Sequence, residues 1–207
     1  MKIGFIGCGN MGGALAKRFA AAGHEVMLSA RHIEHAESCA KECGKNASAG
    51  TVTDAVKFGE IIVLAIPYSE IQPAIKSAGD LKGKTVLDVT NVLTPDFSGL
   101  AIGFSTSGAE EVDKLTSGAK VVKAFNTVFA QVVADPEFSD KPSVFIASDD
   151  ADAKSKVMKL ASDIGFEAID AGALKNARLL EPLGMLNIFL GYQAKMGTDI
   201  AFRLMKR

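Results

Sequence analysis

Three glycines near the start of the chain, Gly7, Gly9 and Gly12, have the G-x-G-x-x-G spacing of turns that wrap around a pyrophosphate. In such a turn the first glycine permits a tight bend, and the second lets the backbone approach the phosphates. The third lets the following helix pack against the preceding strand. The helix N-terminus then faces the anion with free N–H groups. The spacing therefore predicts a dinucleotide site.

The elements around these glycines are those that a dinucleotide site needs. Residues 2–6 form a short apolar strand pattern, and residues 14–22 are rich in alanine with helical patterning. Gly23 is placed to end that helix before a second strand at residues 25–28. Glycine pairs also occur in ordinary loops, so this strand–turn–helix context, more than the spacing, favours the dinucleotide interpretation.

The residues after the second strand indicate which nucleotide is bound. An acidic side chain there would accept hydrogen bonds from the ribose of NAD, but the chain has Ser29, Ala30 and Arg31. A hydroxyl and a guanidinium suit a phosphate on the adenosine ribose, which predicts NADP. His32 would assist by stacking or charge. The alternative is that Arg31 is only a surface charge at a helix start.

The rest of the chain alternates between strands and helices. A continuous apolar run at residues 61–66, closed by Pro67, is typical of a parallel strand covered on both faces. Further strands are predicted at 51–53, 85–89 and 120–125, helices at 33–43, 69–78 and 107–116, and a loop at 92–105. The alternation predicts right-handed crossovers and an α/β fold of the Rossmann type, with a doubly wound parallel sheet.

Beyond residue 130 the pattern continues on a smaller scale, with strands at 143–147 and 166–170 around a helix at 149–164. We place a boundary here, between a dinucleotide-binding Rossmann domain (residues 1–130) and a smaller α/β extension (residues 131–207). A terminal helix over 177–192 should be broken or kinked at Pro182. Its apolar stretch is about half of what a membrane span needs. We expect it to pack on the chain's own core and on a second subunit, as a homodimer.

Polar side chains follow the predicted strands at the edge where ligands of parallel sheets bind. Ile66, Pro67 and Tyr68 should lie at this edge, together with Asn91 and Asn126. Asn126 and Lys123 are the residues most capable of polar chemistry at this edge. Lys123 could equally snorkel from its strand, and Asn126 could cap a turn. A partly buried Lys123 would have a lowered pKa and could act as an acid toward a carbonyl or imine.

Composition excludes several classes of function. Hydrophobic residues make up 48% and charged residues 23% of the 207 residues, as in soluble globular enzymes. The net charge of −1 gives no reason to expect nucleic acid or anionic membranes as partners. The three cysteines are sparse and no signal-peptide pattern is present, so we expect a reducing cytoplasm, core or half-buried thiols, and no metal-ligand cluster. All three histidines precede the strand ends near the ligand, which argues against a histidine-based dehydrogenase.

Five segments together carry a family resemblance. They are I-G-C-G-N-M-G at 6–12, S-A-R at 29–31, D-V-T-N at 88–91, V-V-K-A-F-N-T at 121–127 and A-R-L-L-E at 177–181. With them the chain resembles the F420-dependent NADP reductase family over essentially its whole length. It is more distantly similar to the cytoplasmic oxidoreductase domain of the STEAP metalloreductases. The most specific signal is K-A-F-N-T followed about fifty residues later by A-R-x-x-E.

This resemblance implies hydride transfer between NADPH and a deazaflavin (coenzyme F420) or a flavin such as FMN or FAD, a small-molecule redox acceptor bound over the nicotinamide. We expect the extension at residues 131–207 to complete the acceptor site and to form the dimer interface. The resemblance implies that the pyrophosphate is contacted by Gly9, Asn10, Met11 and Gly12, and the adenosine phosphate by Ser29 and Arg31. It also implies that the nicotinamide is flanked by Ile66, Pro67, Tyr68, Ala124, Phe125 and Asn126.

Transfer between two stacked rings needs no general acid or base, so we assign no catalytic residue. Two alternatives stay open. One is a non-catalytic NADPH sensor that regulates a partner protein. The other is a reductase of a small imine or carbonyl substrate.

Overall fold

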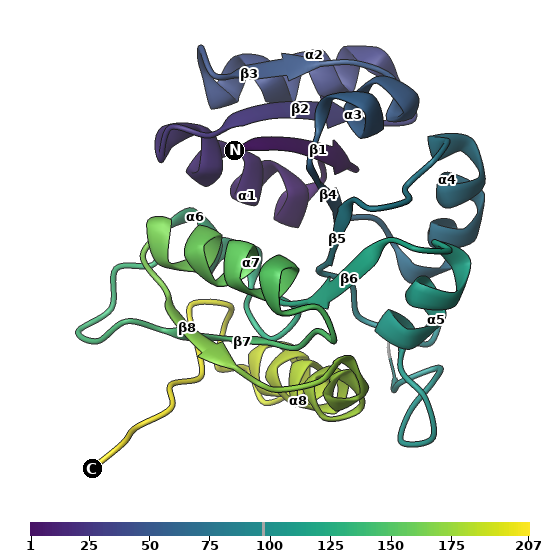
Figure 1. Cartoon of the computed structure of the whole chain (residues 1–207). Helices are drawn as coiled ribbons and strands as arrows, with labels where there is room; N and C mark the ends of the chain where they lie inside the picture. Colours follow the sequence, from purple (N-terminus) through teal and green to yellow (C-terminus); the bar gives the residue numbers. More distant parts are fainter. Residues whose placement is uncertain (97) are drawn as a thin grey trace.

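A computed structural model describes residues 1–96 and 98–207. Six parallel strands form one sheet in the order β3-β2-β1-β4-β5-β6 (Figure 1). The strands are β1 (Lys2–Ile6), β2 (Glu25–Ser29), β3 (Ala47–Ala49), β4 (Ile61–Leu64), β5 (Thr85–Asp88) and β6 (Lys120–Lys123). The order reverses between β1 and β4, as in a doubly wound sheet. The predicted Rossmann-type fold is therefore confirmed.

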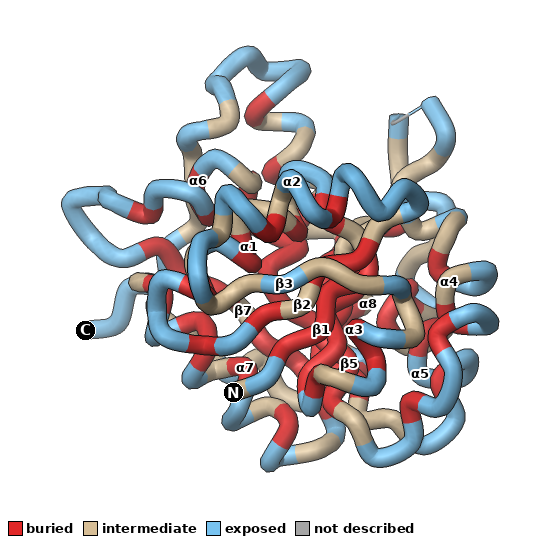
Figure 2. The backbone as a smooth tube through the Cα atoms, turned by 90° about the horizontal axis from the view of Figure 1, so that it is seen from above, coloured by how far each residue is buried: buried red, intermediate tan, exposed pale blue. Residues whose placement is uncertain are grey.

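Helices cover both faces of the sheet, so its centre is buried (Figure 2). One face carries α1 (Asn10–Ala21), α2 (Ile33–Cys43), α6 (Ala130–Ala134) and α7 (Ala151–Asp163); the other carries α3 (Val52–Phe58), α4 (Ile71–Ala78) and α5 (Gly108–Leu115). Alternate residues of β4 point to opposite faces. Val63 belongs to the same core cluster as Phe19 of α1, whereas Leu64 belongs to the cluster that contains Ile75 of α4. The continuous apolar run at residues 61–66 thus contributes to a hydrophobic core on each face of the sheet.

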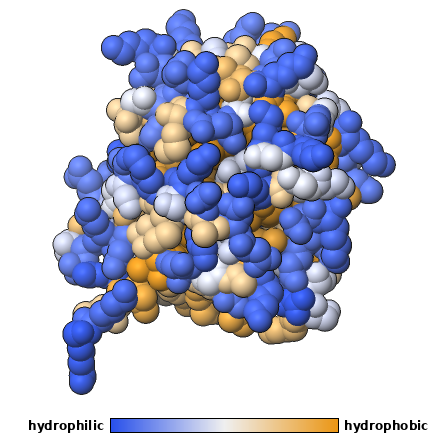
Figure 3. Space-filling view, in the orientation of Figure 1, coloured by the Kyte–Doolittle hydropathy of each residue, from blue (hydrophilic) through white to orange (hydrophobic). Residues whose placement is uncertain are grey.

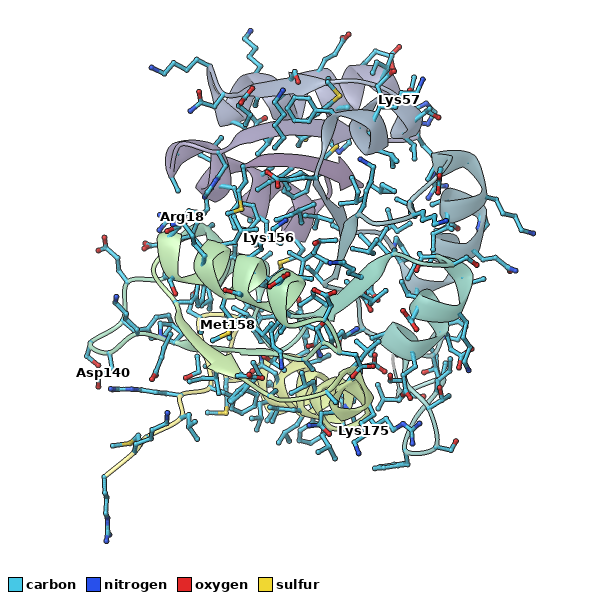
Figure 4. The ribbon with its side chains drawn as sticks, in the orientation of Figure 1. Arg18, Lys57, Asp140, Lys156, Met158 and Lys175 are labelled. Atoms are coloured by element: carbon cyan, nitrogen blue, oxygen red, sulfur yellow. The ribbon has the colours of Figure 1, made fainter. Side chains whose placement is uncertain are left out.

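The last third of the chain adds a smaller unit beside β6. The strands β7 (Ser143–Ile146) and β8 (Glu167–Asp170) pair in parallel around α7, and an antiparallel bridge joins Lys123 to Ala147. Arg18 of α1 lies near the end of α7 (Figure 4), where its guanidinium donates to the carbonyl oxygen of Ile164 at 2.9 Å. Val144 and Phe166 belong to the same core cluster as β1.

The chain ends with α8 (Ala177–Ile188), a π-helical turn (Phe189–Gln193) and an extended tail. Short 3-10 turns at Tyr68–Glu70 and Leu174–Asn176 precede α4 and α8. The loop predicted at 92–105 is present, apart from residue 97, which lies outside the described residues. Among the described residues, no helix has the length and apolar character to cross a membrane.

The strand predicted at 51–53 is wrong, because the third strand is Ala47–Ala49. Thr51 is instead the N-cap of α3. Its side chain accepts from the Asp54 N–H at 3.1 Å, and the Asp54 carboxylate accepts from the Thr51 N–H at 3.0 Å. This capping box outweighs the β-propensity of the threonines.

The sequence predicted a helix broken or kinked at Pro182, and the break is wrong, since α8 runs through this residue from Ala177 to Ile188. A proline inside a helix costs roughly 3 kcal/mol. Burial of Leu180, Glu181, Gly184 and Asn187 along one side of α8 offsets this cost. The helix is therefore held by tertiary packing rather than by its own propensity.

Candidate functional site

The turn between β1 and α1 is tightly packed at two of its three glycines. Gly7 has a φ of 99°, and a Cβ there would lie 2.4 Å from the Ala65 carbonyl oxygen. A Cβ on Gly12 would lie 2.3 Å from the Gly7 carbonyl oxygen. At Gly9, by contrast, a Cβ would meet no atom of the described residues within 4 Å. The packing of the fold therefore requires glycine at positions 7 and 12. Gly9 instead leaves its backbone accessible from outside the protein.

That bare backbone leads into the N-terminus of α1. Gly9 is the N-cap and no side chain caps the helix, nor does its first turn contain an acidic residue. The first N–H groups of a helix have no partner within it, and the helix dipole makes this end positive. The turn thus offers N–H donors to an anion.

A first cavity of about 510 Å³, here called the Arg31 cavity, opens beside this turn. Seven predicted site residues line it: Gly7, Gly9, Ser29, Arg31, His32, Ile66 and Pro67. The side chains of Arg31 and His32 are exposed. Ser29, however, is fully buried, and its hydroxyl donates to the Phe5 carbonyl oxygen at 2.6 Å. Arg31 is therefore better placed than Ser29 to bind a phosphate.

A second cavity of about 630 Å³, here called the Asn126 cavity, lies further along the same edge of the sheet. Seven predicted residues line it: Asn10, Met11, Ile66, Pro67, Asn91, Phe125 and Asn126. The two cavities share Ala65, Ile66 and Pro67, at the end of β4. They therefore form one groove across the carboxyl ends of the strands, where ligands of doubly wound sheets bind.

Two asparagines anchor α8 at this groove. Asn91 Nδ2 donates to the Asn126 carbonyl oxygen at 2.8 Å, and Asn126 Nδ2 donates to the Leu180 carbonyl oxygen at 2.8 Å. Gly184 lets α8 approach, because a Cβ there would lie 2.6 Å from Asn91 Oδ1. Asn126 is 4% exposed, yet its Oδ1 has no hydrogen-bond partner among the residues that the structure describes. A buried acceptor left unpaired beside a cavity is an available contact for a ligand donor.

Phe125 holds the turn that delivers Asn126. Its φ is 62°, a left-handed conformation that is unusual for a bulky residue. The ring is fully buried and packs edge-on against Phe19 and Phe166, with centroid distances of 6.4 and 5.9 Å. Strain of this kind costs on the order of 1–3 kcal/mol and persists only where surrounding structure enforces it. The aromatic packing supplies that enforcement.

Lys123 is buried inside the protein and lines neither cavity. Its Nζ lies 2.9 Å from Asp88 Oδ2, 3.1 Å from Glu181 Oε1 and 2.6 Å from the Thr90 carbonyl oxygen. Burial alone would lower the pKa of Lys123, but the two carboxylates outweigh it and raise that pKa. The predicted fall in pKa is therefore wrong, and Lys123 is a structural cation rather than an acid.

The same ion cluster explains the A-R-L-L-E segment. Glu181 accepts hydrogen bonds from the N–H groups of Gly108 and Ala109, at 2.9 and 3.2 Å, at the start of α5. Arg178 makes a bidentate pair with Glu110, at 2.8 and 2.6 Å. Both charges of the segment thus fasten α8 to the sheet and to α5. Their role is to position the wall of the groove.

A family model described as "NADP oxidoreductase coenzyme F420-dependent" matches residues 2–92. The F420-dependent NADP reductase of Methanothermobacter marburgensis is 31% identical over 95% of this chain and 95% of its own. The chain belongs to the F420-dependent NADP reductase family. Membership confirms the resemblance and makes the protein an NADP-dependent oxidoreductase.

Two further relatives support this family assignment. A crystal structure from Arthrobacter sp. FB24, described as a candidate F420-dependent NADP-reductase, superposes with a TM-score of 0.90 over all of both chains at 27% identity. Metalloreductase STEAP3 of Rattus norvegicus is 29% identical over 89% of this chain, which spans 37% of that longer protein. The whole-length match to the Arthrobacter structure shows that the two chains share one fold.

Three predicted site residues line neither cavity. Gly12 is used in packing α1 on the turn, as described above. Ala124 is fully buried at the end of β6. Tyr68 begins the 3-10 turn before α4, and its ring lies against Gly108 of α5, away from the groove. Burial and the nearby carboxylates of Glu111, Glu181 and Asp88 raise the pKa of Tyr68.

The individual residues through which the C-terminal extension lines the Asn126 cavity were not predicted from the sequence. These residues are Gln131, Gly184, Asn187, Ile188, Tyr192 and Gln193. They come from α6, α8 and the π-helical turn. The signal that could have revealed them is the set of amides within an otherwise apolar segment, since buried amides need partners.

The three cysteines are free thiols close to the glycine turn. Burial, together with Cys39 and Cys43, raises the pKa of the Cys8 thiol to about 12, so Cys8 is no nucleophile. Two of these thiols lie beside a histidine, a grouping that the sequence did not reveal. Cys8, His35 and Cys39 bring their ligand atoms within 4.8 Å of one another.

Proposed function

We propose that the groove binds NADPH along the strand ends and that the protein transfers a hydride between NADP(H) and a deazaflavin, coenzyme F420. The family assignment supports the nucleotide and names the acceptor of the relatives. In this proposal Arg31 and His32 hold the adenosine phosphate, the N-terminus of α1 holds the pyrophosphate, and the Asn126 cavity takes the nicotinamide.

The residues of the groove fit such a ligand at two points that the protein's own packing does not explain. Gly9 meets nothing that would exclude a side chain, so the missing Cβ leaves room for the phosphates. Asn126 Oδ1 is buried without a partner and is a ready acceptor for a carboxamide N–H. The groove therefore supplies donors at one end and an acceptor at the other.

The observation that carries the proposal is the neutrality of the Asn126 cavity. Among the described residues that line it, Tyr192 is the one ionisable side chain, and the others are apolar, hydroxyl or amide groups. Hydride transfer between two rings needs alignment and exclusion of water rather than a protein acid. Reduction of a carbonyl or imine needs a proton donor near the reacting atom. The cavity thus favours a ring acceptor such as F420, FMN or FAD.

We further propose that residues 131–207 form a C-terminal extension that completes the acceptor site. Asn187, Tyr192 and Gln193 supply one wall of the Asn126 cavity, opposite the glycine turn and β4. The ion cluster of Lys123, Asp88 and Glu181 holds α8 in this position. An acceptor ring bound here would lie between two parts of the chain that are distant in sequence.

Apolar side chains on α8 and the turn after it support a homodimer. Leu179, Leu186, Phe189, Tyr192 and Met196 are each at least 44% exposed. Figure 3 shows apolar residues along the lower edge of the molecule, in the region of α8. Patches of this kind mark interaction surfaces. Light scattering at micromolar protein should give a dimeric mass, and a monomeric mass would contradict the homodimer.

The experiment that tests the function is an acceptor screen that follows the loss of NADPH absorbance. We expect turnover with F420, and slower or no turnover with FMN, FAD, ferric chelate or small imines. Tight NADPH binding without turnover on any acceptor would instead support a nucleotide sensor. A cytoplasmic location, expected from the free thiols, is consistent with a soluble acceptor.

Tyr192→Phe is a matched variant for the same screen. It removes the ionisable group of the cavity and keeps the ring that packs on Phe129. If the acceptor is a ring that takes a hydride, the rate should stay within about 2-fold, since general acid catalysis is worth roughly 100- to 10,000-fold where it operates. A loss of that size with an imine or carbonyl would assign Tyr192 as its acid.

A further inference from the structure

All three cysteines of the chain line one depression of about 400 Å³ beside the glycine turn. Cys8 lies within the turn, between Gly7 and Gly9. Cys39 and His35 lie four residues apart on α2, so they share a face of that helix. Two elements that are remote in sequence thus bring thiol and imidazole groups together.

The ligand atoms of three of these residues form a compact group. The Sγ atoms of Cys8 and Cys39 and a ring nitrogen of His35 lie within 4.8 Å of one another. Cys39 Sγ is 3.9 Å from His35 Nε2, and it donates to the Cys8 carbonyl oxygen at 3.3 Å. Cys43 is one helical turn further on and lines the same depression, but it is not part of this group.

We propose that Cys8, His35 and Cys39 bind one zinc ion, with a fourth position open to water. Two thiolates and an imidazole are ligands that Zn²⁺ prefers, whereas Mg²⁺ and Ca²⁺ need oxygen ligands. Around a tetrahedral zinc the ligand atoms lie roughly 3.5–3.8 Å apart at ordinary bond lengths. The observed group closes to that size by side-chain shifts of about 1 Å. Binding releases the two thiol protons to solvent and leaves the ion and its thiolates neutral overall.

The position of this site ties it to the groove without depending on the proposed function. Cys8 and His35 also line the Arg31 cavity, so the zinc site and the groove share a wall. An ion here would join the glycine turn to α2 and stabilise the folded chain by mass action. Metal binding is measured in the absence of NADPH and F420. A protein that does not bind metal would therefore contradict the zinc site and leave the hydride-transfer proposal unaffected.

The test uses the full chain, reduced and stripped of metal with a chelator, and titrated with Co²⁺ as a spectroscopic substitute for Zn²⁺. We expect one Co²⁺ per chain, a thiolate-to-metal charge-transfer band, and displacement of that band by Zn²⁺. Zn²⁺ should also raise the unfolding temperature of the wild type.

Cys39→Ser and His35→Ala should each weaken binding by more than about 100-fold, since loss of even an outer-shell partner costs roughly 10- to 100-fold. Cys43→Ser is the matched control on the same helix and should bind like the wild type.

Three results would overturn the proposal. The first is a wild type without the charge-transfer band at stoichiometric Co²⁺. The second is an equal loss of binding in Cys43→Ser and Cys39→Ser. The third is unchanged binding in His35→Ala, whose exposed side chain can be removed without disturbing the core. That exposed position keeps the test decisive if Cys39→Ser, at a half-buried site, proves unstable.

Discussion

Replacing Gly9 with alanine separates the requirements of the ligand from those of the fold. The backbone at Gly9 has φ −69° and ψ −162°, which alanine adopts without strain, and its new Cβ would meet no protein atom within 4 Å. Stability should therefore change by no more than about 1 kcal/mol, in the stabilising direction. NADPH binding should suffer, because the methyl group occupies the space through which the phosphates approach.

The expected loss follows from the cost of overpacking, about 1–3 kcal/mol for an inserted methyl group. At about 1.4 kcal/mol per tenfold change, this weakens NADPH binding roughly 5- to 150-fold. The assay is a fluorescence titration with NADPH, paired with urea unfolding of the same protein. Gly12→Ala is the control: its Cβ would lie 2.3 Å from the Gly7 carbonyl oxygen, so this variant should lose stability itself. Wild-type NADPH affinity in Gly9→Ala would refute the placement of the pyrophosphate.

Three further predictions concern the phosphate, the ion cluster and pH. Arg31→Ala should weaken NADPH binding by more than about tenfold, because loss of a charge-assisted hydrogen bond costs roughly 1.5–3 kcal/mol. NADH binding should stay nearly unchanged. Equal effects in titrations of the two nucleotides would show that Arg31 does not bind the phosphate. In urea unfolding, Glu181→Ala should lower the free energy of unfolding by about 3–5 kcal/mol, because it removes one partner of the buried Lys123. Arg178→Ala should lower it by at most about 1 kcal/mol, because the ion pair of Arg178 with Glu110 is half-exposed. Similar losses in the two variants would contradict the structural role of the buried cluster. Burial lowers the pKa of His24, and so does the N-terminal ammonium group, which lies 3.3 Å from Nδ1 of the ring. The Asp163 carboxylate, 3.1 Å from Nε2, acts in the opposite direction but is outweighed. The unfolded chain then binds more protons, so stability should fall as pH drops below about 6.5, and His24→Gln should flatten that fall in unfolding curves taken across this range.

Local patterns were sufficient to predict the glycine turn and most of the sheet. The spacing of Gly7, Gly9 and Gly12 implies one strand, one turn and one helix, and the apolar run that ends at Pro67 implies a strand buried on both faces. The residues after each strand then had to meet at one edge, as Arg31 and Asn126 do along the groove. These inferences need only periodicity and the rules of parallel sheets.

Features that depend on long-range packing were not predictable in this way. Nothing near Lys123 in the sequence reveals that Asp88 and Glu181 surround it, so its burial and raised pKa could not be foreseen. The continuity of α8 through Pro182 likewise depends on contacts with the sheet. The capping box of Thr51 is the exception, since T-x-x-D is a local signal that was available in the sequence.

Transfer of the hydride itself is the measurement that tests the central claim most directly. NADPH carrying deuterium at both C4 positions of the nicotinamide is incubated with F420 and the protein, and the reduced deazaflavin is analysed by mass spectrometry. Direct transfer between rings aligned in the Asn126 cavity predicts that the deuterium appears in reduced F420. Reduced F420 without deuterium, or NADPH bound with no reduction of F420, would contradict the account.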